Sequence, residues 1–565
     1  MRRALGAVLV SGSLVLPSGA FAFTVDASPA APGRLTDPAP GGGSGDWMAE
    51  PLGLGVRELR LGVATELLVG EEDPPTKLLP GMHLTQAVID VDADGDDELL
   101  QVRGALAAPK IALADGRTGA AIWSVQRPDP NFLLDSVPAE GGGQDILLFF
   151  QGNGGLGVSV LSGTTGAARW TRTLTYGSEG IGYFGVSQAG SGYDLVFGSW
   201  DIPVFQLVDL SFEFRSLATG QVTGSGTVTG EGQYPSLALA GDLDADDVGD
   251  VFALGGSTGF GAASGGQLSA LTDRGSTEHW STTFLEPVSD FTYAIGALDA
   301  TGDGTRDVLL WSEFLGAGDG QTNEIVSIVD GRGGALAGLR PIARVDLDLW
   351  VHQMLLPGDI NGDSAEEVIF SGAVLFFDGR GGVSFEAVGS GGTLWQATPD
   401  IAGASGGFGY DWNSHAGDLN GDGAQDALIL MAASGVTSSI GLSQRSGAVL
   451  WRADSGAGAF DVPALTDLDG DGADDVVHAI TGTRVGTTTI DVAFTAASGR
   501  DLQPLWSHEI SLDAGSGFFF NAIGGHLDGS TARNDLIAEY TLAPSYSRHH
   551  AEALNGLDGS VLWTA

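Results

Sequence analysis

The chain has 565 residues, 43% of them apolar, with 90 glycines and no cysteine. It carries 25 Lys and Arg against 71 Asp and Glu, a formal net charge of −46, which argues against nucleic acid and anionic membrane as partners. The lack of cysteine excludes disulfides, thiol catalysis and a lipoprotein anchor, and glycine usage without a collagen period favours an all-β protein rich in tight turns.

The N-terminus is predicted to be a secretory signal peptide over residues 1–22. A basic start precedes the apolar stretch Leu5–Leu16, and Ala20-Phe21-Ala22 forms a small-residue cleavage site. The apolar stretch is too short to span a bilayer, although an uncleaved N-terminal anchor is the alternative. We expect a secreted protein, extracellular or at the cell surface, with no direct membrane insertion after cleavage.

Two segments separate this leader from the rest of the chain. Residues 23–50 are rich in Ala, Pro and Gly and are predicted to form a flexible linker. Residues 51–83 are a transitional segment with an entry strand near Glu58–Leu68.

Residues 84–565 repeat one unit, an apolar strand followed by an acidic hairpin loop and a second apolar strand. Six loops keep acids at fixed spacing and begin at Asp90, Asp242, Asp299, Asp359, Asp418 and Asp467. Three weakened copies keep the strand but have lost most of the acids: Gln144–Phe150, Tyr193–Phe197 and His526–Asp535. Units of roughly 50 residues hold four short strands. We therefore predict an all-β fold, a β-propeller of eight or nine four-stranded blades, with a linear β-solenoid as the alternative.

A second motif, a glycine turn followed by Trp, comes after the acidic loops. It is fullest at Asp115–Trp123, and weaker forms end at Trp170, Trp280, Trp451, Trp506 and Trp563. Asp330–Gly334 and Asp378–Gly382 keep the turn without the Trp. The motif predicts a hairpin turn and an outer strand whose Trp packs between neighbouring units.

The acidic loops are predicted to bind calcium at several sites. In a nine-residue loop, side chains at positions 1, 3 and 5 can share one concave side, glycine at position 6 allows a sharp turn, and an acid at position 9 closes the shell. Calcium accepts such oxygens at variable angles, whereas magnesium demands stricter geometry. The predicted ligands, four per loop, are Asp90, Asp92, Asp94, Glu98, Asp242, Asp244, Asp246, Asp250, Asp299, Thr301, Asp303, Asp307, Asp359, Asn361, Asp363, Glu367, Asp418, Asn420, Asp422, Asp426, Asp467, Asp469, Asp471 and Asp475.

The loops differ in completeness. Asp247 and Ser364 replace the glycine at position 6 in two of them, and Thr301 replaces an acid at position 3 in another. Two alternatives stay open at this point: Asp-Gly turns that only join strands, and an acidic surface adapted to high salt.

These hairpins and their flanking strands resemble the FG-GAP/VCBS repeats of integrin α-subunit propellers and their bacterial and archaeal relatives, over residues 84–565. The resemblance implies calcium in the loops of successive blades, on secreted or surface proteins that bind partners. The pattern at Asp115–Trp123 is similar to the Trp-docking motif of quinoprotein (PQQ-type) propellers, which supports the architecture and says little about a cofactor.

No catalytic residue and no cofactor site besides calcium is predicted. Nine histidines are scattered, and the adjacent pair His549-His550 would point to opposite faces of a strand. We expect a non-catalytic binding or adhesion module for a protein or polysaccharide, and not an enzyme. The alternatives are an extracellular propeller enzyme, either a quinoprotein-like oxidoreductase or a polysaccharide-degrading enzyme, and an assembly role.

Overall fold

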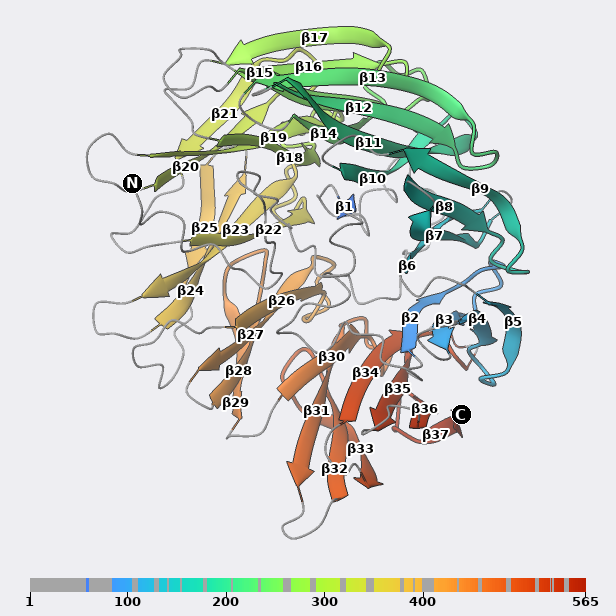
Figure 1. Ribbon diagram of the computed structural model, residues 1–565. Coiled ribbons are helices and arrows are strands. Elements are labelled where there is room, and N and C mark those ends of the chain that lie inside the picture. Colours follow the sequence, from blue (N-terminus) through green and yellow to red (C-terminus); the bar gives the residue numbers. More distant parts are fainter. Residues whose placement is uncertain are drawn as a thin grey trace.

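The fold is a ring of nine four-stranded antiparallel blades, seven of which are separate sheets (Figure 1). The computed structural model describes residues 57–59 and, with short gaps, residues 84–564. Every regular element among these residues is a strand. The predicted all-β propeller is thereby confirmed, with nine blades. The predicted signal peptide (1–22) and the predicted linker (23–50) lie outside the described residues. Of the transitional segment 51–83, the structure describes only strand β1, Arg57–Leu59.

The blades follow one another along the chain. Blades 1 to 5 comprise β2 (Leu84–Ile89), β3 (Glu98–Arg103), β4 (Lys110–Asp115), β5 (Ala121–Gln126); β6 (Phe132–Pro138), β7 (Gln144–Gly152), β8 (Gly155–Leu161), β9 (Ala168–Thr175); β10 (Gly180–Ala189), β11 (Gly192–Val204), β12 (Leu207–Ser216), β13 (Val222–Glu231); β14 (Ser236–Gly241), β15 (Asp250–Ser257), β16 (Gly266–Thr272), β17 (Thr277–Phe284); and β18 (Phe291–Leu298), β19 (Asp307–Leu315), β20 (Thr322–Val329), β21 (Leu336–Pro341).

Blades 6 to 9 comprise β22 (Trp350–Gly358), β23 (Glu367–Leu375), β24 (Gly381–Gly389), β25 (Gly392–Ala397); β26 (Asp411–Gly417), β27 (Asp426–Ala433), β28 (Val436–Leu442), β29 (Val449–Ser455); β30 (Phe460–Thr466), β31 (Asp475–Thr483), β32 (Thr489–Ala497), β33 (Pro504–Asp513); and β34 (Phe518–Gly525), β35 (Asp535–Leu542), β36 (Arg548–Leu554), β37 (Val561–Thr564). In each blade the acidic hairpin, or its weakened copy, joins the first strand to the second.

Blades 3 and 4 are hydrogen-bonded into one larger sheet. The outer strand β13 pairs with β15 in parallel through Gly230 and Gly256. Strand β1 pairs antiparallel with β10 of the same sheet and lies inside the ring (Figure 1). The predicted entry strand near Glu58–Leu68 therefore overlaps β1 at its start, and the remainder falls outside the described residues.

The hydrophobic core is a series of layers between neighbouring blades. One cluster joins blades 8 and 9 around Phe494, and another joins blades 2 and 3 around Phe197. Middle strands are apolar on both faces, as in β8, where every residue is buried. Outer strands alternate partly buried and exposed positions, as in β5, because one face packs on the next blade and the other meets solvent.

Tryptophans of the outer strands link seven of the nine blades to the next one, in the manner that the second motif predicts. Indole Nε1–H donates to a turn carbonyl of the following blade in the pairs Trp123–Gly163, Trp170–Leu217, Trp280–Gly331, Trp395–Gln444, Trp451–Gly499, Trp506–Gly556 and Trp563–Gly116. The last bond, 2.8 Å long, closes the ring between residues 447 positions apart.

The outer turn of blade 6 was predicted wrongly. The sequence Asp378–Gly382 falls where β23 gives way to β24, and not between the third and fourth strands. The fourth strand is β25, and its Trp395 supplies the link that the sequence assignment omitted.

Substituting Trp563 tests how the ring closes. Trp563→Phe keeps most of the ring volume and loses the Nε1–H donor, so unfolding free energy should fall by about 1 kcal/mol. Trp563→Ala also leaves a gap against Gly119, whose position the indole contacts, and should cost about 3–5 kcal/mol. Denaturant unfolding measures both, and equal losses for Phe and Ala would contradict the hydrogen-bonding role.

Candidate metal centres

The acidic loops share one hydrogen-bonding scheme, numbered here from 1 at the first aspartate to 9 at the last acid. The position 1 carboxylate accepts the backbone N–H groups of positions 5 and 6: in blade 1, Asp90 accepts from Asp94 at 3.2 Å and from Gly95 at 3.0 Å. Blade 8 departs from this at position 5, because the N–H of Asp471 donates to Asp469 at 3.0 Å. The position 5 carboxylate then accepts the N–H of position 7, as Asp94 does from Asp96 at 2.9 Å. The acids therefore organise their own loop.

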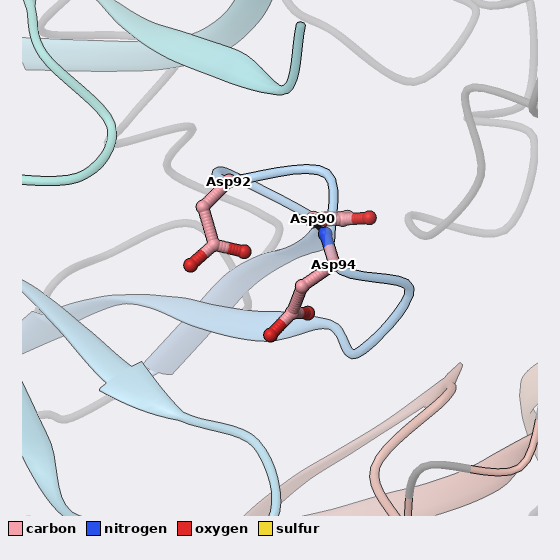
Figure 2. Close-up of side chains that lie close together, drawn as sticks. All are labelled: Asp90, Asp92 and Asp94. Carbon is pink, nitrogen blue, oxygen red and sulfur yellow. Dashed lines mark hydrogen bonds between the residues drawn. The ribbon is translucent and has the colours of Figure 1, made fainter.

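Three loops bring three carboxylates together. The clusters are Asp90, Asp92 and Asp94; Asp242, Asp244 and Asp246; and Asp467, Asp469 and Asp475, in each of which one oxygen per residue lies within 4.8 Å of the others. Figure 2 shows Asp92 and Asp94 extending to the same side of the blade 1 loop. An oxygen-only donor set on a short loop fits a hard divalent cation.

The other three loops carry a neutral residue at position 3, namely Thr301, Asn361 or Asn420. They keep the same backbone scheme; Asp418, for example, accepts from Asp422 at 3.1 Å and from Gly423 at 2.8 Å. In blade 6 the Asn361 amide donates to Asp363 and Glu367, so a side-chain amide already lies among the acids.

Two loop positions adopt left-handed backbone conformations. Position 6 has φ of 63° at Asp247 and 74° at Ser364, close to the glycines that occupy it elsewhere. Position 4 has φ of 60° at Ala93 and 61° at Ala245. In the other four loops position 4 is a glycine with φ between 71° and 82°. The sequence pattern identified the requirement at position 6 and missed the one at position 4, although four glycines mark it.

The position 9 acids are deeply buried, and burial raises their pKa values. The pKa of Glu98 rises to about 8, chiefly through desolvation, with repulsion from Asp92, Asp90 and Asp94 added. The same causes raise the pKa of Asp250 and of Glu367 to about 7. Uncharged carboxyls are therefore favoured at position 9 unless a cation compensates them.

Position 9 has a structural role that the sequence did not reveal. In blade 5, Asp307 accepts the N–H of Thr301 from its own loop and that of Gly331 from the outer turn, both at 2.9 Å. The Gly331 carbonyl accepts Trp280 of the preceding blade at 2.6 Å. One buried carboxylate thus connects the acidic loop to the contact between blades.

Position 8 fastens several of the loops to the loop of the preceding blade, a second feature that the sequence did not reveal. Asp474 donates its N–H to the Asp418 carbonyl at 2.7 Å, and its carboxylate accepts the Asp418 N–H at 2.8 Å. The same pair of bonds joins Asp97 to His526 between blades 1 and 9.

In the weakened blades, arginines neutralise the remaining acids. Arg169 pairs with Asp145 at 2.7 Å in blade 2, and Arg274 of blade 4 pairs with Asp194 of blade 3 at 2.6 Å. In blade 9, Arg533 pairs with Asp528 at 2.7 Å. A fixed cation thus lies where the loop carboxylates have been lost.

The raised pKa values predict how calcium and pH interact. The folded pKa of Asp475 is about 7, above the roughly 4 of an unfolded aspartate, so with calcium chelated the stability contribution is present near pH 4 and is lost as pH rises through 7. Calcium requires the ionised form, so binding at pH 7 should release roughly half a proton per ion. Calorimetric titration in buffers of different ionisation enthalpy measures this release, and identical heats in all buffers would contradict it.

Comparison with known proteins identifies no family for this chain. No family model and no curated protein matches the sequence. Among solved structures, the chain is similar to the rhamnogalacturonan lyase YesW, with 13% identity over 82% of this chain and 88% of that one and a TM-score of 0.34. It is also similar to the exotype rhamnogalacturonan lyase YesX, with 11% identity, the same coverage and a TM-score of 0.30.

These neighbours correct the functional expectation. Both are named as rhamnogalacturonan lyases. The expectation of a non-catalytic binding or adhesion module, and that of a chain that is not an enzyme, are therefore not kept. No catalytic residue and no activity is transferred from these neighbours. Within the described residues, no helix is long and apolar enough to cross a membrane.

Proposed function

We propose that the acidic loops bind calcium and that the ions stabilise a secreted β-propeller. The observation that carries this proposal is the grouping of three carboxylates in each of three loops, including Asp90, Asp92 and Asp94. Such acids repel one another, and a divalent ion offsets the repulsion.

Calcium suits these loops better than other biological cations. Carboxylates, amides and carbonyls are hard oxygen donors, which do not favour zinc or copper. Asn361, Asn420 and Thr301 stand in for an acid at position 3, and calcium tolerates such variation in charge and geometry more readily than magnesium. The ion would be held by positions 1, 3 and 5 in blades 1 and 4, and by positions 1, 3 and 9 in blade 8.

Metal analysis of the purified chain tests the proposal. After dialysis against calcium and then metal-free buffer, we expect several calcium ions per chain, at most one for each acidic loop, and little magnesium. Absence of bound calcium even after exposure to excess ion would overturn it.

We further propose that the repeats belong to the FG-GAP/VCBS class. The position of each acidic loop, between the first and second strands of a blade, supports this assignment. If the repeats are equivalent, the blade 8 loop, Asp467–Asp475, can be replaced by the sequence of the blade 7 loop, Asp418–Asp426. The exchanged protein should fold and still bind calcium.

The activity to seek is degradation of a polysaccharide, the alternative that the sequence left open. YesW and YesX are named as rhamnogalacturonan lyases, so rhamnogalacturonan is the first glycan to test. A screen of extracellular polysaccharides with calcium present, scored for chain shortening, should detect cleavage. A screen without any cleavage would remove this part of the proposal and leave calcium binding intact.

We also propose secretion through the signal peptide. Its test is N-terminal sequencing of the exported protein, which should begin at Phe23.

A further inference from the structure

Arg500 reaches the acidic loops of two neighbouring blades from the outer turn that joins β32 to β33. Its Nε donates to Asp471 Oδ2 at 2.8 Å, and Nη2 donates to the Asp471 carbonyl at 3.1 Å. Nη1 donates to the carbonyl of Asn420 in the blade 7 loop. One guanidinium therefore touches position 5 of the blade 8 loop and position 3 of the blade 7 loop.

The blade 7 loop is shaped to admit this guanidinium. Gly421 has φ of +73°, and a Cβ built on it would lie 2.2 Å from Arg500 Nη2. A side chain at this position would displace the arginine. Two further hydrogen bonds hold the same two loops together: the Asp474 N–H donates to the Asp418 carbonyl at 2.7 Å, and the Asp418 N–H donates to the Asp474 carboxylate at 2.8 Å.

Arg500 is the cation at the junction of the two loops. Its hydrogen bonds end on a carboxylate of the blade 8 loop and on a backbone carbonyl of the blade 7 loop. A single positive charge therefore lies between the two sets of acids.

Arginines at the matching turn position elsewhere serve one loop. Arg332 in blade 5 contacts Asp303 and Thr305, both in its own blade. Arg117 in blade 1 pairs with Asp96, again in its own blade. In the part of the chain that the structure describes, Arg500 is the outer-turn arginine with hydrogen bonds to two acidic loops.

We propose that Arg500 couples the calcium sites of blades 7 and 8 as a shared counter-ion, so that filling one loop weakens binding in the other. This inference rests on the calcium binding proposed above. The guanidinium holds the carboxylate of Asp471, the predicted position 5 ligand, which lies outside the cluster of Asp467, Asp469 and Asp475. A calcium ion that draws Asp471 into its shell must therefore displace the arginine. The displaced charge is retained by the remaining acids of blade 7, where it repels a second ion. Coupling is reciprocal, so the effect is the same in either order of filling.

The test is hydrogen–deuterium exchange of the full chain at a series of calcium concentrations. Separate peptides report the protection of the blade 7 loop and of the blade 8 loop. In the native protein, the segments 418–426 and 467–475 should gain protection at separate calcium midpoints. Arg500→Gln should lower the calcium concentration at which segment 467–475 is half protected by about threefold to tenfold, and should bring it closer to the midpoint of segment 418–426. The difference between the variant and the native midpoints should shrink as the salt concentration is raised. Arg500→Lys keeps the positive charge but loses the forked guanidinium, so its midpoint for segment 467–475 should lie between those of the native chain and Arg500→Gln.

Arg172→Gln provides the matched control. It removes the same charge from an exposed arginine that donates to the carbonyls of Thr171 and Thr219 in blades 2 and 3, and both midpoints should stay at their native values. Equal midpoints in Arg500→Gln and Arg172→Gln, with protection by calcium retained, would overturn the coupling and leave the calcium sites standing. No protection of either loop by calcium in the native chain would overturn both proposals.

Discussion

Chelation of calcium should lower the melting temperature of the chain by on the order of 10 °C. Each bound ion contributes about 2.7 kcal/mol when free calcium is a hundred times its dissociation constant, and the three three-carboxylate loops together contribute about 8 kcal/mol. For a propeller of this size, a loss of about 8 kcal/mol corresponds to a fall in melting temperature of on the order of 10 °C. Scanning calorimetry with excess calcium and then with excess chelator measures it.

Charge removal in one loop separates the two effects of the acids. Asp467→Asn with Asp469→Asn should reduce the calcium-dependent shift by roughly a third, because one of three clusters is lost. In chelator, the same variant should melt above the native chain, because repulsion within the loop has been removed. Asp558→Asn, in the outer turn of blade 9 where Asp558 binds the Ser560 N–H, is the matched control and should leave the shift unchanged. A native melting curve that ignores chelator would mean that the acids form only a salt-adapted surface.

The blades and their acidic loops could be predicted because their signals are local. A nine-residue loop such as Asp467–Asp475 has its acids and its turn in one short segment, and hydrogen bonds within that segment define its shape. The Trp motif is local as well, although Asp378–Gly382 shows that a similar turn sequence can fall in a different hairpin of the blade.

Contacts between blades could not be predicted in this way. The position 8 residues that fasten one loop to the next are Asp97, Glu366, Asp474 and Asn534; each donates a backbone N–H, which leaves little trace in residue type. The Trp563–Gly116 bond and the Asp97–His526 pair join opposite ends of the chain. The acids at position 9, expected only to complete the calcium shell, also have a structural role. In blade 5 the carboxylate of Asp307 accepts the N–H of Gly331 in the outer turn, more than twenty residues away, so the sequence of the loop alone does not reveal this role.

The arginine pairs of the weakened blades lead to the second large effect. Arg274→Gln should lower the free energy of unfolding by about 3 kcal/mol, because it leaves a buried carboxylate without its cation. Arg274 Nε lies 2.6 Å from Asp194 Oδ2, and the Asp194 side chain is only 2% exposed. Arg274 has a left-handed backbone conformation, with φ of 58°. Glutamine also has a Cβ and is strained to the same degree there, so the substitution changes the charge and leaves the backbone strain as it was.

Calcium should not alter this loss, which distinguishes a fixed cation from an exchangeable one. The decrement for Arg274→Gln should be the same in excess calcium and in excess chelator, whereas loop variants lose stability only when calcium is present. Adding Asp194→Asn should restore much of the loss, because a neutral amide needs no counter-charge, and the double-mutant cycle gives the coupling between the two residues. A loss that calcium reverses would show that a metal ion, and not Arg274, compensates Asp194. An arginine that replaces the ion also explains how blade 3 keeps a buried acid at position 9 after losing the loop that surrounds it in other blades.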